Sequence, residues 1–312
     1  MTAPTAGPMS AIEHEIGPHG TLIMSIPFGR IEIHAVDGTI ARVRDVAPHE
    51  PLLLADQATA TLRVEMVHGH GLRWGRPPSP DVQVEVPAGA RVEIDTTTAE
   101  VIAQGLLGEQ RIRTVSGGVR LEHAGGGIEV TGVAGDVWLD ADRQLAARVR
   151  TVSGEVHMRA PSWRLLEVRT MSGAVHVEGR ILPGAHRIET VSGDAELVGT
   201  ADMAAEATTV SGDITTDLPH TTSGGLGRRS MRLGSGEARV TFKSMSGDLA
   251  ILRGATVAAS DPTTPGPAQP AAGGDGAPGD AEAARLGVLE ALERGAIDVA
   301  EAARRLAELD RG

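Results

Sequence analysis

The chain has 312 residues, with 29 Lys and Arg against 41 Asp and Glu, so its net charge is −12 at pH 7, and it contains no Cys. This charge disfavours nucleic acid, because such binding depends on cations that neutralise phosphates. The lack of Cys excludes disulfides, thiolate catalysis and Cys-based metal centres. Apolar residues make up 41% of the chain but aromatic residues only 2%. With 40 Gly, this composition predicts an all-β protein of short strands and tight turns, with a core of Val, Ile, Leu and Ala.

The N-terminal segment lacks the features of an export signal. Residues 1–19 have neither a basic stretch nor an apolar run, and no later stretch approaches the roughly 18 apolar residues of a membrane span. We therefore expect residues 1–20 to be disordered, with no transmembrane segment. The predicted location is the cytoplasm, or the inner face of the cell envelope.

Residues 21–97 are predicted to form an N-terminal β capping region. Four segments alternate apolar and polar residues between Pro and Gly turns: Gly29–Val46, Thr61–Val67, Asp81–Val86 and Arg91–Asp95. A terminal coil that is not covered leaves backbone groups unpaired, so we expect these strands to cover one end of the domain that follows.

A repeat with a period near 19 residues occupies residues 98–254. Its core is the string T-V-S-G or a close variant, and a degenerate copy at Ala134 keeps the period. The repeated Ser residues are Ser116, Ser153, Ser172, Ser192, Ser211 and Ser246. A fixed period of this length indicates stacked units, none of which can bury its apolar face alone.

Each unit alternates apolar and polar residues with period two. Val119 and Leu121 follow Ser116, Ile112 precedes it, and the other units keep the same positions apolar. This pattern predicts two short strands per unit, joined at a Ser-Gly corner. The fold predicted from residues alone is a β-solenoid with coils of about 19 residues. Its closing coils are expected to be irregular, with Ser246–Leu252 as the last strand.

A charge pattern supports this register. The residues five positions before each repeat centre alternate in sign: Arg111, Glu129, Arg148, Glu167, Arg187 and Glu206. In a parallel, in-register stack, neighbours of opposite charge lie about 4.8 Å apart and attract. We therefore predict a charge ladder that specifies register more than it adds stability.

The C-terminal part changes character. Residues 255–280 are rich in Pro, Gly and Ala and predict a flexible linker. Residues 281–312 predict a small α-helical hairpin, with Leu286, Leu289 and Leu292 at helical spacing and a capping box from Asp298 to Glu301. A hairpin this short is marginal alone, so we expect it to bind a protein partner or a second copy.

The repeat resembles a known family at Thr151–Val156, Thr190–Asp194 and Thr209–Ile214. It is similar to the bacterial DUF4097 proteins, also named "putative adhesin" or β-strand-repeat proteins. The resemblance covers about residues 28–252, and the terminal helices look like a hairpin in envelope-stress relatives. It implies a β-solenoid and a role near the envelope, with no catalytic residues.

The repeated Ser residues are interpreted as structural. A nucleophilic Ser needs a base and an oxyanion site and occurs once per active site, whereas here it recurs and Ala134 replaces it. His157 and His176 share a register, with Glu155 nearby, and could bind a divalent metal. A flat, open face rarely completes a coordination shell, so a polar ladder is favoured over a metal site.

Two further charged groups are interpreted as solvated surface. Five carboxylates follow the corners: Asp136, Glu155, Asp194, Asp213 and Asp248. They lack the nine-residue spacing of calcium-binding repeats. Arg150 and Arg169 could form a basic patch, but Glu167 and Glu189 dilute it.

The sequence shows no group of residues typical of an enzyme's active site. The predicted function is therefore that of a non-enzymatic scaffold or interaction protein without a cofactor. The alternative is a surface adhesin or matrix component. An enzyme acting on polysaccharides is disfavoured because sugar sites use aromatic platforms, and this chain has five aromatic rings.

Overall fold

The computed structural model describes residues 12–45, 53–66, 80–199, 202–225 and 228–254. The predicted linker at 255–280 and helical hairpin at 281–312 lie outside the described residues. So do residues 1–11 of the segment predicted to be disordered. Residues 12–15 of that segment form a strand instead. This strand pairs antiparallel with residues 40–43, and Ile12 packs against the core.

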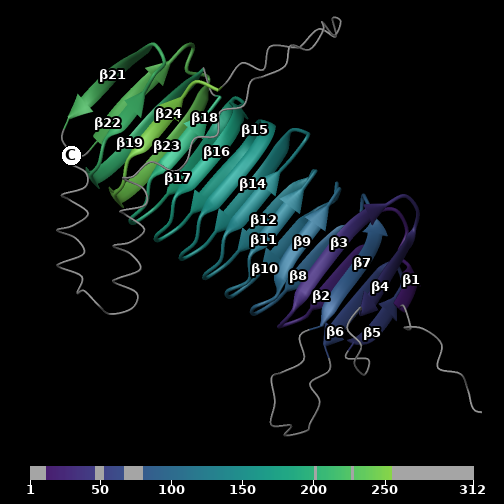
Figure 1. Cartoon of the computed structure of the whole chain (residues 1–312). Helices are drawn as coiled ribbons and strands as arrows, with labels where there is room; N and C mark the ends of the chain where they lie inside the picture. Colours follow the sequence, from purple (N-terminus) through teal and green to yellow (C-terminus); the bar gives the residue numbers. More distant parts are fainter. Residues whose placement is uncertain (1–11, 46–52, 67–79, 200–201, 226–227, 255–312) are drawn as a thin grey trace, which may run out of the picture. The chain divides into compact units, whose positions relative to one another are not determined.

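The described residues form an all-β structure, one large and mostly parallel sheet that curves round an axis (Figure 1). Its strands are β1 (Ile12–Glu15), β2 (Thr21–Ser25), β3 (Arg30–Val36), β4 (Ile40–Asp45), β5 (Leu53–Ala58), β6 (Thr61–Met66), β7 (Asp81–Pro87), β8 (Arg91–Asp95), β9 (Glu100–Gln104), β10 (Gln110–Arg113), β11 (Val119–Glu122), β12 (Gly127–Thr131), β13 (Val137–Asp140), β14 (Leu145–Arg150), β15 (Val156–Arg169), β16 (Val175–Ile181), β17 (Gly184–Glu189), β18 (Ala195–Val198), β19 (Met203–Ser211), β20 (Ile214–Thr216), β21 (His220–Gly225), β22 (Arg228–Leu233), β23 (Ala238–Ser246) and β24 (Leu249–Leu252). Within the described residues, no helix is long and apolar enough to cross a membrane.

The pairings arrange the strands in two ladders. The first ladder runs β5-β6-β2-β8-β10-β12-β14-β15-β17-β23-β19-β22-β21. The second runs β1-β4-β7-β3-β9-β11-β13-β15-β16-β18-β24-β20. A strand of the first ladder and the strand of the second ladder that follows it in the chain together form one layer of the stack. We call this layer a rung. The long strand β15 contributes its first half to the second ladder and its second half to the first.

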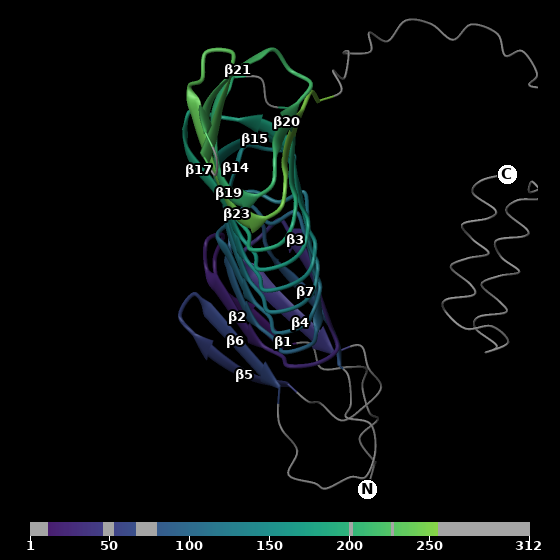
Figure 2. The same ribbon diagram turned by 90° about the vertical axis from the view of Figure 1, so that its left-hand side faces the viewer.

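The rungs near both ends do not follow chain order. At the C-terminal end, β23 and β24 lie between β17/β18 and β19/β20. The predicted last strand, Ser246–Leu252, contains β24, the last described strand in chain order, but this strand does not lie at the end of the stack. The chain first builds the outer rung β19/β20, covers β19 with the antiparallel hairpin β21–β22, and then returns to fill the inner place. Figure 2 shows this end facing the viewer, and Figure 1 shows β21 beyond β22 and β19 at the end of the first ladder.

The N-terminal end uses a similar arrangement. Strands β6 and β7 lie outside β2 and β3, although they come later in the chain. Strands β2, β3 and β6–β9 all have parallel neighbours, and the antiparallel strands β1, β4 and β5 cover the outer side. Most of the range predicted to be a cap thus continues the parallel ladders.

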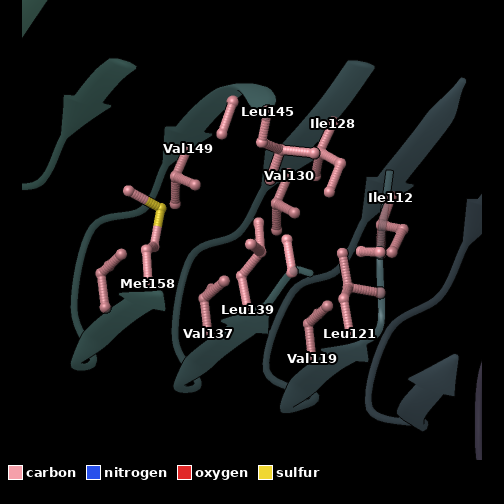
Figure 3. Packing of buried hydrophobic residues seen from close by; sticks show 14 of the residues in the cluster. Ile112, Val119, Leu121, Ile128, Val130, Val137, Leu139, Leu145, Val149 and Met158 are labelled. Carbon is pink, nitrogen blue, oxygen red and sulfur yellow. The ribbon is translucent and has the colours of Figure 1, made fainter. Parts of the chain in front are cut away.

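The core consists of inward side chains stacked rung on rung (Figure 3). Ile112 lies over Val130, and Val130 over Val149, in the first ladder. Val119 and Val137 are paired in the same way in the second ladder. All five are at most 2% exposed. One rung could not bury these residues alone, so stability is shared between neighbours.

The corner between the two ladders explains the repeated string. The Thr hydroxyl points inward, and Thr114 Oγ1 accepts a hydrogen bond from the N–H of Gly117 at 2.9 Å. At Gly154, φ is 115°, a region open mainly to glycine, and an added Cβ would collide with the carbonyl oxygen of Gly135 in the rung below. The glycine is therefore required by a close approach of two backbones.

Candidate functional site

A row of stacked rings lies on the outer face of the second ladder. The register places Arg120, Trp138, His157 and His176 side by side in successive strands. The rings of Trp138 and His157 stack with centroids 4.0 Å apart and planes 9° from parallel. The guanidinium carbon of Arg120 lies 5.6 Å from the centre of the Trp138 ring on a cation–π contact. Trp138 remains 43% exposed, whereas Trp163 is fully buried.

This row lines an open groove of about 450 Å³. A second outward row forms its other wall, in which Asp140 and Arg159 make an ion pair at 2.7 Å. His157 Nε2 lies 2.9 Å from Glu155 Oε2, and His176 Nδ1 lies 3.6 Å from Glu196 Oε2. The predicted metal candidates thus lie on one face, but each histidine has its own carboxylate. Among the residues that the structure describes, no three His, Asp or Glu side chains are grouped to hold a metal ion.

The repeated Ser residues lie at the corners between the ladders. Ser172 pairs with Ser192, Ser192 with Ser246, and Ser246 with Ser211. The bond that holds the corner comes from the backbone, because the N–H of Ser153 donates to Val133 O at 2.8 Å and the N–H of Ala134 donates to Val115 O at 2.7 Å. The Ser153 hydroxyl contributes only a long contact of 3.4 Å. Ala134 can therefore replace Ser without loss of the corner.

The charged row follows the predicted order over five strands. Arg111 pairs with Glu129 at 3.1 Å and Arg148 with Glu167 at 3.4 Å. Arg187 aligns with Glu167 on one side. On its other side Arg187 is aligned with Thr241 of β23. Thr241 is in turn aligned with Glu206, so it lies between Arg187 and Glu206. The last predicted step, from Arg187 to Glu206, is wrong because β23 is inserted between their strands.

Three of the five carboxylates that follow the corners bind backbone groups, while Glu155 contacts His157 and Asp213 contacts Arg229. Asp136 Oδ1 accepts the N–H of Glu155 at 2.9 Å, Asp194 Oδ1 accepts that of Asp248 at 2.9 Å, and Asp248 Oδ1 accepts that of Asp213 at 2.7 Å. Each of these acids thus links its rung to the next. This use of the side chains needs no bound cation.

The predicted basic patch is neutralised by its neighbours. Arg169 lies 3.0 Å from Glu167 and from Glu189, and Arg150 lies 3.5 Å from Glu129 and 3.7 Å from Glu167. Because these carboxylates interleave with the guanidinium groups, the row carries little net positive charge.

A continuous apolar row, which we call the corner ridge, was missed by the sequence reasoning. It is formed by the residue just before each repeated Ser, or before Ala134: Val115, Val133, Val152, Met171, Val191, Met245 and Val210. These side chains are between 41% and 82% exposed. Backbone hydrogen bonds connect neighbouring members of the ridge. The N–H of Met171 donates to Val152 O at 3.2 Å, and the N–H of Met245 donates to Val191 O at 3.3 Å. The Val or Met in each T-[VM]-S-G string was the available signal.

Two histidines have shifted pKa values. His123, close to the groove, forms an ion pair with Asp142 at 2.6 Å, and this hydrogen bond raises the pKa of His123. His186 points into the core of the first ladder and is 2% exposed. Burial lowers the pKa of His186, and its Nε2 bonds to Leu182 O at 2.9 Å. His186 is therefore a structural group remote from the outer faces.

Several solved structures resemble this chain. A "putative adhesin" from Bacteroides fragilis NCTC 9343 is 10% identical, with 80% of this chain and 98% of that chain covered and a TM-score of 0.43. A "putative lipid binding protein" from Parabacteroides distasonis ATCC 8503 is 15% identical, with 80% and 97% covered and a TM-score of 0.38. A "putative cell adhesion protein" from Clostridium sporogenes ATCC 15579 is 10% identical, with 78% and 99% covered and a TM-score of 0.25.

These likenesses are too distant to say what this chain binds, and no curated protein matches it. The match to a family model is of a different kind, because it spans residues 19–252 and so includes the corner ridge and every strand of both ladders except β1. The chain belongs to the Toastrack DUF4097 family.

Proposed function

We propose that this chain is a non-enzymatic β-solenoid scaffold that binds another protein through the corner ridge. The observation that carries the proposal is the unbroken exposure of seven apolar side chains on adjacent rungs. Scattered exposed apolar residues are ordinary on protein surfaces, but a contiguous strip of them is typical of an interaction site. Backbone hydrogen bonds between neighbouring corners hold the side chains of the strip in register.

The described surface supports binding more than catalysis. The repeated Ser residues bond through their backbones, and outward carboxylates such as Glu129 and Asp136 are paired with an arginine or with a backbone N–H group. His157 stacks on Trp138 and contacts Glu155. These contacts give each group a structural partner, which favours a scaffold.

The C-terminal segment provides a second proposed attachment. Residues 281–312 are proposed to recruit a protein partner, tethered by residues 255–280, in the cytoplasm or at the inner face of the envelope. The support comes from the sequence, where Leu286, Leu289 and Leu292 are spaced as one side of a helix.

A photo-crosslinking amino acid placed at Val152 in the native host tests the ridge. We expect one defined protein adduct, identified by mass spectrometry, that disappears when Met171→Glu is added. The same amino acid placed at Arg159, on the outer face of the second ladder, is the matched control and should not give that adduct. Equal adducts from both positions, or none from Val152, would contradict the proposal.

The alternative function, a surface adhesin or matrix component, places the ridge outside the cell. Fractionation decides between the two. Native protein found outside the membrane would support the adhesin, whereas protein retained with cytoplasmic or inner-envelope proteins supports the scaffold.

A further inference from the structure

We propose that the partner on the corner ridge is a second copy of this chain, aligned parallel to the first. This inference rests on the proposed function of the ridge as a docking surface and names its occupant. The charges on either side of the ridge determine both the partner and its orientation.

The two sides of the ridge carry residues of opposite charge, although each cation of the basic side also has a carboxylate partner within its own chain, as Arg113 has in Asp95 at 3.4 Å and Lys243 has in Glu189 at 3.8 Å. On one side lies the basic flank, two residues before the ridge residue of its rung, and on the other the acidic flank, three residues after it. The basic flank consists of Arg113, Arg150, Arg169 and Lys243. The acidic flank consists of Asp136, Glu155, Asp194, Asp213 and Asp248. Glu189 lies in the row of the basic flank and is paired with Arg169 at 3.0 Å.

Opposite charges of equivalent rungs face each other in only one twofold arrangement, at the rungs of Val152 and Met245, whereas Glu189 then faces Asp194 at the rung of Val191. When the twofold axis runs along the ridge, the acidic flank of each copy faces the basic flank of the other. When the axis runs across the ridge, acidic flank faces acidic flank and basic flank faces basic flank, so that like charges lie opposite one another and repel. The parallel arrangement also pairs each rung with its equivalent. Arg150 of one copy then faces Glu155 of the other, because both residues belong to the rung of Val152.

The area of the strip sets the strength that we expect. Seven ridge residues at about 4.8 Å per rung give a strip roughly 30 Å long. Together with its flanks this is at the small end of specific interfaces, about 1,200 Å² in total. Each chain also carries a charge of −12, which is screened beyond about 8 Å at physiological salt. We therefore expect a reversible dimer with a Kd on the order of 10 to 100 μM.

Sedimentation equilibrium of the full chain at physiological salt measures this association. The wild type should dimerise in the stated range, and Met171→Glu should weaken the dimer by at least about tenfold, equivalent to 1.4 kcal/mol. If Met171→Glu lowers the melting temperature, Met171→Ser serves as the ridge variant. Arg159→Glu, which makes the same charge change on the second ladder as Arg150→Glu does on the first, should leave the Kd within about twofold.

A charge-swap pair tests the orientation. Arg150→Glu and Glu155→Arg should each self-associate more weakly than the wild type. In a dimer of either variant, residue 150 of each copy faces residue 155 of the other with the same charge, so two repulsive contacts form. An equimolar mixture of the two variants should dimerise as the wild type does, because both contacts become complementary. A monomeric wild type, or a mixture that stays monomeric, would overturn the inference. If the chain is monomeric but Val152 still crosslinks to a different protein, the ridge remains a docking surface and only its occupant is wrong.

Discussion

Single residues at the corners fix how closely the rungs can stack. At Gly154 two requirements coincide, a φ of 115° and a backbone carbonyl where a Cβ would lie. Gly173 meets the same two requirements, because its φ is also positive and the carbonyl of Gly154 lies where its Cβ would be. The requirement for glycine therefore recurs in the next rung. Gly127, in contrast, has open space where its Cβ would lie and lacks a positive φ.

Gly154→Ala is therefore expected to lower the free energy of unfolding by about 2–4 kcal/mol, since both backbone strain and a steric clash are introduced. Chemical denaturation followed by circular dichroism measures the change. Gly127→Ala is the matched control and should alter stability by no more than about 0.5 kcal/mol. Equal effects of the two substitutions would show that the corner does not constrain the backbone.

His186 is expected to make the fold sensitive to acid. Burial lowers its pKa in the folded protein, so protonation favours the unfolded chain, where the pKa is about 6.5. This contribution is absent above pH 6.5, and stability falls as pH decreases from there toward the lowered pKa. The loss has a limiting slope of about 1.4 kcal/mol per pH unit. Between thermal melts at pH 7 and pH 5, the melting temperature of His186→Gln should change less than that of the wild type.

Among the strands, the inserted pair β23/β24 has a measurable consequence. Strand β24 is bonded on both sides, to β18 and to β20, although it is the last strand of the described chain. Strand β20 is three residues long and, among the strands that the structure describes, has only β24 as its neighbour. Chain order alone would instead place β20 inside and β24 at the edge.

Hydrogen exchange should distinguish these two arrangements. We expect the amides of Leu249–Leu252 to exchange at least about tenfold more slowly than those of Ile214–Thr216, because opening an interior strand breaks bonds on both sides. Mass spectrometry after proteolysis resolves the two segments. Faster exchange in the later segment would contradict the inserted order.

At the scale of the whole molecule, the local pattern was predictable and the order of the end rungs was not. The period-two spacing around Ile112 and Val119 predicts which residues point inward. The opposite charges of Arg111 and Glu129 predict the register between adjacent units. The string at Lys243–Gly247 resembles any other corner, so nothing local says that β23 pairs with β17 rather than following β19. The Arg187 and Glu206 signs even fitted the wrong neighbour. The corner ridge was not recognised because period-two alternation, which predicts burial within strands, stops at the corner.

The ladders should fold without the C-terminal segment. Core side chains of the described strands contact one another from Ile16 to Ile251, and the last strand, β24, ends at Leu252. Deleting residues 280–312 should therefore leave the β-type circular dichroism unchanged and the melting temperature within about 2 °C. The same deletion should remove any partner recruited by that segment while retaining dimers formed through the corner ridge. Loss of the β signal would mean that the ladders depend on the C-terminal segment and are not an independent folding unit.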